Sequence, residues 1–124
     1  MISVGTDIVA INRIKDTIVS KKDAFLTKIY TEKEIEYCNA LKNSYVNFSG
    51  KYAAKEAVKK AILSKELLER ISLKDIEILN NANGSPYVKL SVKINKDLDI
   101  DLSISHEREY AIGFAVITIL WFQF

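Results

Sequence analysis

Hydrophobic residues follow two different periods along the chain, and the change falls near Leu73. Before that point apolar residues recur mainly every three or four positions, which is typical of helices, and after it they recur every second position, which is typical of strands. An apolar stretch at residues 1 to 8 comes first and predicts a short strand. This order predicts an α+β fold in which an antiparallel sheet packs on a long central helix.

Three helices are predicted between the first strand and Leu73. The first is amphipathic, with an apolar stripe formed by Ile11, Ile14 and Ile18. Thr31 and Glu34 have the spacing of a capping box, so a second helix is expected to begin there and to run to about Lys42. The third helix is the longest and covers residues 45 to 64.

Two hairpins are predicted after the helices. The first pairs the alternating segments at residues 75 to 78 and 87 to 92, across a cluster of Asn, Gly and Ser. The second pairs residues 99 to 105 with the mostly apolar residues 110 to 120. That last segment is shorter than a membrane span and rich in β-branched and aromatic residues, so a buried strand explains it better.

Composition narrows the class of protein. The chain has 124 residues, of which 48% are apolar and 27% charged, and this predicts a single folded domain over residues 1 to 124. A net charge of +2 gives no strong overall attraction to nucleic acid, so an acidic partner has to be met by a local basic cluster. The lone Cys38 cannot form an internal disulfide, and no export signal is recognised, so a cytoplasmic protein is expected.

Two acidic residues stand in apolar surroundings. Asp7 closes the first predicted strand, and Glu56 lies in the Ala-rich part of the long helix. Burying a carboxylate is costly unless a positive group lies beside it, so the pair predicts a hard divalent cation between them. The alternative for Asp7 alone is that it accepts backbone N–H groups of the following turn.

Lys60 follows Glu56 by one helical turn on a stripe that also carries Tyr52. If a pyrophosphate lay along this stripe, Glu56 could hold a cation on two of its oxygens and Lys60 could neutralise a third. The alternative is a surface ion pair between Glu56 and Lys60, worth about 0.3 to 0.5 kcal/mol. The spacing leaves both possibilities open.

Other candidate residues have ordinary structural explanations when taken singly. His106 lies between the strands of the second hairpin and could meet a phosphate, but an isolated histidine in a loop is more often simply exposed. Gly84 and Pro86 first of all form a turn. Cys38 on a helix is first of all a small core residue.

Four segments carry a family resemblance: Gly-Thr-Asp-Ile at residues 5 to 8, Phe-Ser-Gly-Lys-Tyr-Ala-Ala-Lys-Glu-Ala at 48 to 57, Asn-Gly-Ser-Pro-Tyr at 83 to 87 and Ser-Ile-Ser-His at 103 to 106. In combination the chain resembles the holo-acyl-carrier-protein synthases, the short single-domain group of 4'-phosphopantetheinyl transferases. The blocks span nearly the whole chain in order, which is far more specific than any single motif.

The resemblance implies an enzyme of fatty acid biosynthesis. It would move the 4'-phosphopantetheine group of coenzyme A onto a serine of apo acyl carrier protein and release adenosine 3',5'-bisphosphate. Asp7 and Glu56 would bind Mg²⁺, and Glu56 and Lys60 would be the catalytic residues, with Lys60 on the side of the leaving group. Either a metal-bound water or Glu56 could accept the serine proton, and the sequence does not choose between them.

The resemblance also implies a binding site for coenzyme A. Lys51, Lys60 and His106 would contact its phosphates, and Gly84 and Pro86 would complete the nucleotide pocket of a neighbouring chain. The family typically forms homotrimers with active sites at subunit interfaces. Lys51 stands where an arginine is common, and lysine lacks the fork that binds phosphate with two hydrogen bonds.

A basic cluster is the expected docking surface for the acidic carrier protein. It comprises Arg13, Lys15, Lys21 and Lys22. The alternative is an ordinary solvated surface. The aromatic tail at residues 121 to 124 is expected to pack on the sheet or at a subunit contact.

Two rival functions remain to be compared with the transferase. One is a catalytically silent module that keeps the coenzyme A pocket or the docking surface, although the presence of both carboxylates and Lys60 argues against it. The other is a small nucleic-acid-binding domain, which should carry basic and aromatic residues on its strands. The predicted strands instead carry acidic residues, namely Asp75, Glu77, Asp99 and Asp101. Neither nucleic acid nor a membrane is therefore an expected partner.

Overall fold

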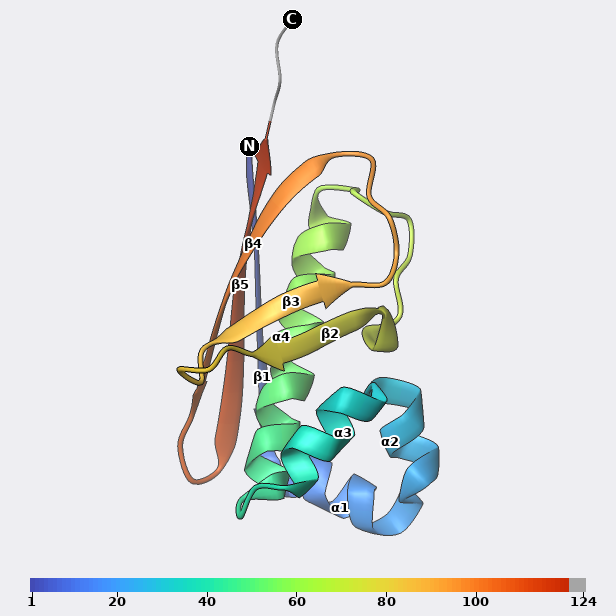
Figure 1. Cartoon of the computed structure of the whole chain (residues 1–124), viewed down its shortest axis with the longest axis vertical. Helices are drawn as coiled ribbons and strands as arrows, with labels where there is room; N and C mark the ends of the chain where they lie inside the picture. The colour runs from blue at the N-terminus through green and yellow to red at the C-terminus, as the bar shows by residue number, and fades with distance from the viewer. Residues whose placement is uncertain (121–124) are drawn as a thin grey trace, which may run out of the picture.

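Four helices and five strands make up residues 1 to 120, the part of the chain that the computed structural model describes (Figure 1). In chain order the elements are β1 (Ile2–Ala10), α1 (Ile11–Lys21), α2 (Asp23–Ile29), α3 (Glu32–Asn39), α4 (Ser44–Ser64), the short 3-10 helix η1 (Leu73–Asp75), β2 (Ile76–Asn80), β3 (Pro86–Leu90), β4 (Asp97–His106) and β5 (Tyr110–Leu120). The predicted α+β class is confirmed. The aromatic tail at residues 121 to 124 lies outside the described residues, and no helix within them is long and apolar enough to cross a membrane.

The strands form two antiparallel sheets, where the sequence predicted one. β5 lies between β1 and β4 in a three-stranded sheet, and β2 pairs with β3 in a separate two-stranded sheet. Figure 1 shows the larger sheet along one side of α4 and the smaller sheet crossing the helix. Both predicted hairpins are confirmed, although β3 and β4 pack side by side without ladder hydrogen bonds.

Two glycines let α4 lie directly on the larger sheet. A Cβ atom at Gly5 of β1 would overlap the backbone carbonyl of Ala57, and one at Gly113 of β5 would lie 2.5 Å from the carbonyl oxygen of Ala53. Asp7 is paired with Gly113 across the ladder and lies on the same face of β1 as Gly5. The close approach at the glycines therefore brings the Asp7 side chain against α4.

Buried charged side chains cover the free edge of β2, where a further strand would otherwise pair. The backbone N–H of Ile78 donates to Glu34, its carbonyl accepts from Lys51, and the carbonyl of Ile76 accepts from Lys55. Glu34 and Lys55 also form a 2.6 Å ion pair with both side chains fully buried. Satisfying these backbone groups holds the small sheet on α3 and α4.

The structure differs from the prediction in two helices and in the first strand. The seven-residue α2 was not predicted, because it is too short to show a period and has no fully buried residue. The capping box of Thr31 is confirmed, but α3 ends at Asn39 instead of about Lys42. β1 continues to Ala10, because Val9 and Ala10 also pair with β5, so Asp7 lies inside the strand and not at its end.

Candidate functional site

The two predicted metal ligands lie on facing elements, Asp7 on β1 and Glu56 on α4. Nζ of Lys60 lies 3.0 Å from Oδ1 of Asp7 and also donates to the carbonyl of Thr6 at 3.1 Å. The predicted stripe on α4 is confirmed, since Tyr52 and Glu56 are only partly buried and Lys60 is exposed. Two alternatives are wrong: Lys60 pairs with Asp7 and not with Glu56, and Asp7 accepts from Lys60 and not from a following turn.

Tyr52 shares the environment of both carboxylates. Burial raises the pKa of its phenol, the negative charge of Glu56 raises this pKa further, Arg13 lowers it, and Asp7 adds the smallest increase. The phenol therefore lies within electrostatic range of both acids. We call Asp7, Tyr52, Glu56 and Lys60 the carboxylate cluster.

The carboxylate cluster offers two carboxylates, Asp7 and Glu56, as candidate ligands of a metal ion. Within residues 1 to 120 there is no group of three or more His, Cys, Asp and Glu side chains that could hold a metal. Mg²⁺ commonly binds one or two carboxylates together with substrate phosphates and waters, so Asp7 and Glu56 fit such an ion. The side chain of Asp7 is 17% exposed, which leaves its oxygens accessible beside Lys60.

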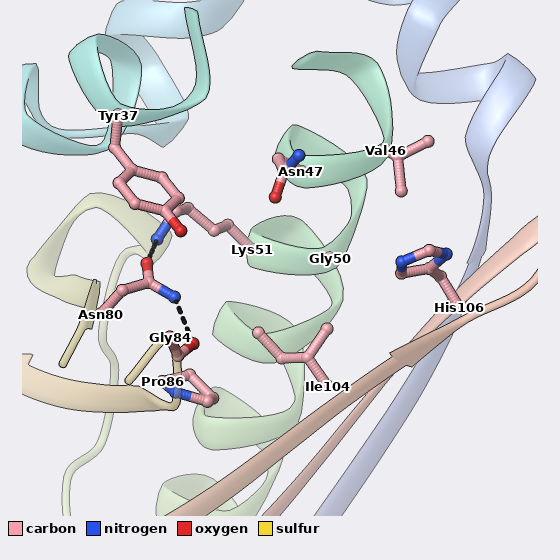
Figure 2. Close-up of a pocket in the computed structure, with 10 residues that line it drawn as sticks. All are labelled: Tyr37, Val46, Asn47, Gly50, Lys51, Asn80, Gly84, Pro86, Ile104 and His106. Carbon is pink, nitrogen blue, oxygen red and sulfur yellow. Dashed lines mark hydrogen bonds between the residues drawn. The ribbon is translucent and has the colours of Figure 1, made fainter. Parts of the chain in front are cut away.

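A pocket of about 240 Å³ brings together four of the five predicted coenzyme-binding residues, Lys51, Gly84, Pro86 and His106. Figure 2 shows Lys51 and the turn with Gly84 and Pro86 on one side of the pocket, and His106 at the end of β4 on the other. Lys60 does not line this pocket, which we call the α4–β4 pocket. His106 is exposed, as expected for a histidine without a special role, and it also forms part of the pocket wall.

Lys51 is held more firmly than a surface lysine. It is only 3% exposed, and its Nζ donates to the carbonyl of Ile78 at 2.6 Å and to Oδ1 of Asn80 at 2.8 Å. Burial lowers the pKa of its ammonium group, and the nearby negative groups only partly offset this. Nζ of Lys51 also lies 4.7 Å from the centre of the Tyr37 ring.

Sequence reasoning missed the other residues that line the α4–β4 pocket, which are Tyr37, Val46, Asn47, Gly50, Asn80 and Ile104. Helical spacing was an available signal for Asn47, which lies one turn before Gly50 and Lys51. No local signal marks Tyr37, because α3 reaches the pocket only through tertiary packing.

The carboxylate cluster and the α4–β4 pocket lie on opposite faces of α4. At about 100° per residue, the pocket residues Asn47 and Lys51 and the cluster residues Glu56 and Lys60 are separated by roughly half a turn around the helix axis. The sheet agrees, because β1 with Asp7 and β4 with His106 are its two edges. One chain therefore presents the two halves of the predicted site in different directions.

The predicted docking surface is exposed, and its residues are Arg13, Lys15, Lys21 and Lys22. The ammonium of Lys15 lies 5.5 Å from the ring centre of Tyr45 on α4. Ile11 and Ile14 are buried beneath this surface, which confirms the amphipathic prediction for α1.

Comparison of sequences places the chain among known proteins. The model of the 4'-phosphopantetheinyl transferase superfamily matches residues 3 to 115. A holo-[acyl-carrier-protein] synthase of Chlamydia caviae is 44% identical over 119 residues, which cover 94% of this chain and 96% of the relative.

Solved structures show the same fold. A holo-(acyl-carrier-protein) synthase of Bacillus anthracis in complex with CoA (3',5'-ADP) superposes with a TM-score of 0.77 at 32% identity, over 93% of this chain and 94% of the other. The corresponding synthase of Helicobacter pylori in complex with coenzyme A has a TM-score of 0.76 at 30% identity, over 93% and 99% of the two chains.

Proposed function

Because the chain belongs to the 4'-phosphopantetheinyl transferase superfamily, we propose that it transfers 4'-phosphopantetheine from coenzyme A to a serine of apo acyl carrier protein. The products are holo acyl carrier protein and adenosine 3',5'-bisphosphate, and the activity is that of a holo-[acyl-carrier-protein] synthase in fatty acid biosynthesis. The observation that carries the proposal is the near full-length identity of 44% to a protein of that name. The carboxylate cluster supplies the polar groups that the reaction needs.

Asp7 and Glu56 are the proposed ligands of one Mg²⁺ ion. When bound, the ion stabilises negative charge on the pyrophosphate of coenzyme A and on the phosphate that leaves. The β1 ladder fixes the backbone of Asp7 and α4 fixes that of Glu56, so rigid elements carry both residues.

The chain's own groups handle the proton and the leaving group. The serine oxygen bonds to the β-phosphorus of coenzyme A, the bond from that phosphorus to the bridging oxygen breaks, and adenosine 3',5'-bisphosphate leaves with the electron pair. The Glu56 carboxylate accepts the serine proton, directly or through a water molecule. The side chain of Lys60 is 54% exposed. Once its ion pair with Asp7 breaks, its ammonium group neutralises the leaving phosphate.

The α4–β4 pocket is the proposed site for the nucleotide end of coenzyme A. Its Gly84, Pro86 and His106 line the wall away from the helix. Because this pocket and the carboxylate cluster face opposite ways, we propose that the pocket of one subunit meets the cluster of its neighbour in a homotrimer. A single molecule of coenzyme A then contacts two chains.

The outer face of the larger sheet supports assembly into an oligomer. Ile2, Val4 and Ile8 on β1 are between 56% and 60% exposed, and Ile112 and Phe114 on β5 are 40% and 45% exposed. The ladder register places these five apolar side chains on one surface. Contiguous exposed apolar patches of this kind mark protein interfaces.

The basic surface of α1 and its C-terminal junction is the proposed docking site of the carrier protein. Arg13, Lys15, Lys21 and Lys22 are all solvent-exposed and attract an acidic partner. Arg13 also lowers the pKa of Tyr52 through its positive charge, which supports a docking surface within electrostatic range of the carboxylate cluster. We further propose a cytoplasmic location, where the carrier protein and coenzyme A are made.

One assay tests the activity. The protein is incubated with apo acyl carrier protein, coenzyme A and Mg²⁺, and the carrier is weighed by mass spectrometry. A gain of one phosphopantetheine group is expected. An unchanged carrier, under conditions in which a known synthase works, would reject the enzyme, and coenzyme A binding without a mass change would favour the silent binding module.

A further inference from the structure

A relay of two hydrogen bonds connects α4 to the turn between β2 and β3. Nζ of Lys51 donates to Oδ1 of Asn80 at 2.8 Å, and Nδ2 of Asn80 donates to the carbonyl of Gly84 at 3.1 Å (Figure 2). All three residues line the α4–β4 pocket. The relay therefore crosses the wall of the proposed nucleotide site.

The helix end of the relay is rigid. Lys51 is 3% exposed, and a second N–H of its ammonium donates to the carbonyl of Ile78. Two of its three N–H groups are thus used inside the protein, and the ring of Tyr37 covers the same nitrogen. This arrangement suits an anchor better than a mobile ligand for phosphate.

The turn end has little else to hold it. Gly84 has a φ of +90°, a Cβ there would meet no atom within 4 Å, and residues 81 to 85 are all exposed, so packing holds the turn only weakly. Its other hydrogen bonds run between its own residues, Asn81, Asn83, Gly84 and Ser85. Among residues 1 to 120, only the Asn80 side chain ties residues 81 to 85 by a hydrogen bond to the rest of the chain.

We propose that Lys51 is a positioning residue, which acts through Asn80 to hold the turn at residues 81 to 85 where Gly84 and Pro86 meet the nucleotide of coenzyme A. This inference rests on the proposed function. It assigns a role to Asn80 and gives Lys51 a task other than direct contact with phosphate. A turn that is already in place loses less conformational entropy on binding, so the relay sets affinity for coenzyme A and leaves the transfer rate unchanged.

Hydrogen exchange of the free protein tests the relay without any ligand. The reporter is the Gly84 amide, which donates to the Asn81 carbonyl within the turn. Asn80→Ala removes both relay bonds, and Asn80→Asp keeps an acceptor for Lys51 but loses the donor to Gly84. Both variants are expected to exchange at Gly84 roughly tenfold faster, as expected for loss of one hydrogen bond. The matched control is Asn81→Ala. Among the described residues the Asn81 side chain hydrogen-bonds only to Ser85, so exchange at Gly84 should stay within about twofold of the native chain.

Kinetics and direct binding test the consequence for the site. Asn80→Ala is expected to raise the KM for coenzyme A and the Kd for adenosine 3',5'-bisphosphate roughly tenfold, with kcat and the KM for the carrier within about twofold. Lys51→Met should act in the same direction, and Lys51→Arg, which keeps donors to Asn80, should restore much of the affinity. If Lys51→Met fails to fold, the Asn80 variants alone still test the relay.

The outcomes separate the relay from the proposed function. Native exchange at Gly84 in Asn80→Ala would overturn the relay whatever the protein binds. Faster exchange with unchanged affinity for the nucleotide, or an equal fall in kcat and in affinity for both substrates, would overturn its role in positioning. If the native protein binds no coenzyme A and modifies no carrier, the proposed function fails, and with it the role of the relay in binding.

Discussion

Nζ of Lys60 lies 3.0 Å from Oδ1 of Asp7, so a cation of α4 already neutralises the carboxylate that β1 presents to the helix. A metal ion that binds Asp7 has to compete with this ammonium group. The sequence predicted Lys60 as a ligand of the leaving phosphate, and the structure shows that the residue also has a partner before any substrate is present.

We therefore expect Lys60→Met to bind Mn²⁺, as a probe for Mg²⁺, about two- to fivefold more tightly in the absence of coenzyme A, a factor that matches the strength of an exposed ion pair. The same variant should turn over more slowly, because the leaving phosphate loses its cation. Metal binding is measured by paramagnetic relaxation. The control is Lys59→Met on the adjacent helix position, which forms no ion pair within residues 1 to 120. Weaker metal binding in Lys60→Met would contradict competition for Asp7.

Asp7→Asn and Glu56→Gln should each lower kcat/KM by about a hundredfold or more, since each removes one metal charge, while changing Tm little. Carrier modification followed by mass spectrometry gives the rate, and thermal unfolding reports the fold. Glu69→Gln, an exposed site outside the cluster, serves as the matched control. Native rates in both cluster variants would refute the assignment of the metal ligands.

Arg13→Glu should raise the KM for the carrier protein about tenfold and change the KM for coenzyme A far less, because the docking surface attracts the acidic carrier. Added salt should mimic the substitution, since it screens exposed charges. Steady-state kinetics with each substrate varied in turn measures both constants. Lys89→Glu makes the same change of sign on β3, outside the docking surface, and should have little effect. An equal rise in both KM values would rule against this surface.

Lys55→Met should reduce the free energy of unfolding by about 3 to 5 kcal/mol, because it leaves the fully buried carboxylate of Glu34 without its cation. Combining it with Glu34→Gln should cost less than the sum of the single changes. Urea unfolding of the four proteins measures this coupling. Strict additivity would show that the two charges do not stabilise one another in the folded state.

The buried thiol of Cys38 should make the folded protein less stable at alkaline pH. Burial raises the pKa of its thiol from 9.0 to about 12, while the positive charge of Lys51 lowers this pKa by a smaller amount and the negative charge of Glu34 raises it. Between these values the unfolded chain has released a proton that the folded chain keeps, so the free energy of unfolding falls as pH rises, by up to about 1.4 kcal/mol per pH unit. Urea unfolding between about pH 8 and pH 9 measures the slope, because the phenol of Tyr30 in the unfolded chain, with its ordinary pKa of 10.0, ionises mainly above this range.

The matched variant for this slope is Cys38→Ala, which has no thiol to ionise and should show a flatter dependence on pH. The native thiol should also resist iodoacetamide until the protein unfolds, because the reactive thiolate is scarce in the folded state. Rapid labelling of the folded protein would contradict both the burial and the raised pKa.

Much of the fold was predictable from local patterns. The periods of three to four and of two located α1, α4 and both hairpins, and the spacing of Thr31 and Glu34 located the start of α3. These features depend on neighbouring residues, whose side chains share a face by simple geometry. The order of the family motifs in the sequence likewise indicated the type of activity, and the comparisons confirm that family.

Tertiary structure alone decided which candidates share a site. The sequence treated Lys51, Lys60 and His106 as one set of phosphate contacts, whereas the fold places Lys60 with Asp7 on one face of α4 and Lys51 with His106 on the other. The roles of Glu34, Asn80 and Tyr37 were also hidden, because each depends on contacts between segments far apart in the chain. The hydrophobic period of a segment shows which side of its own helix or strand a residue occupies. Which residues of other segments it contacts is decided only when the helices and strands pack together.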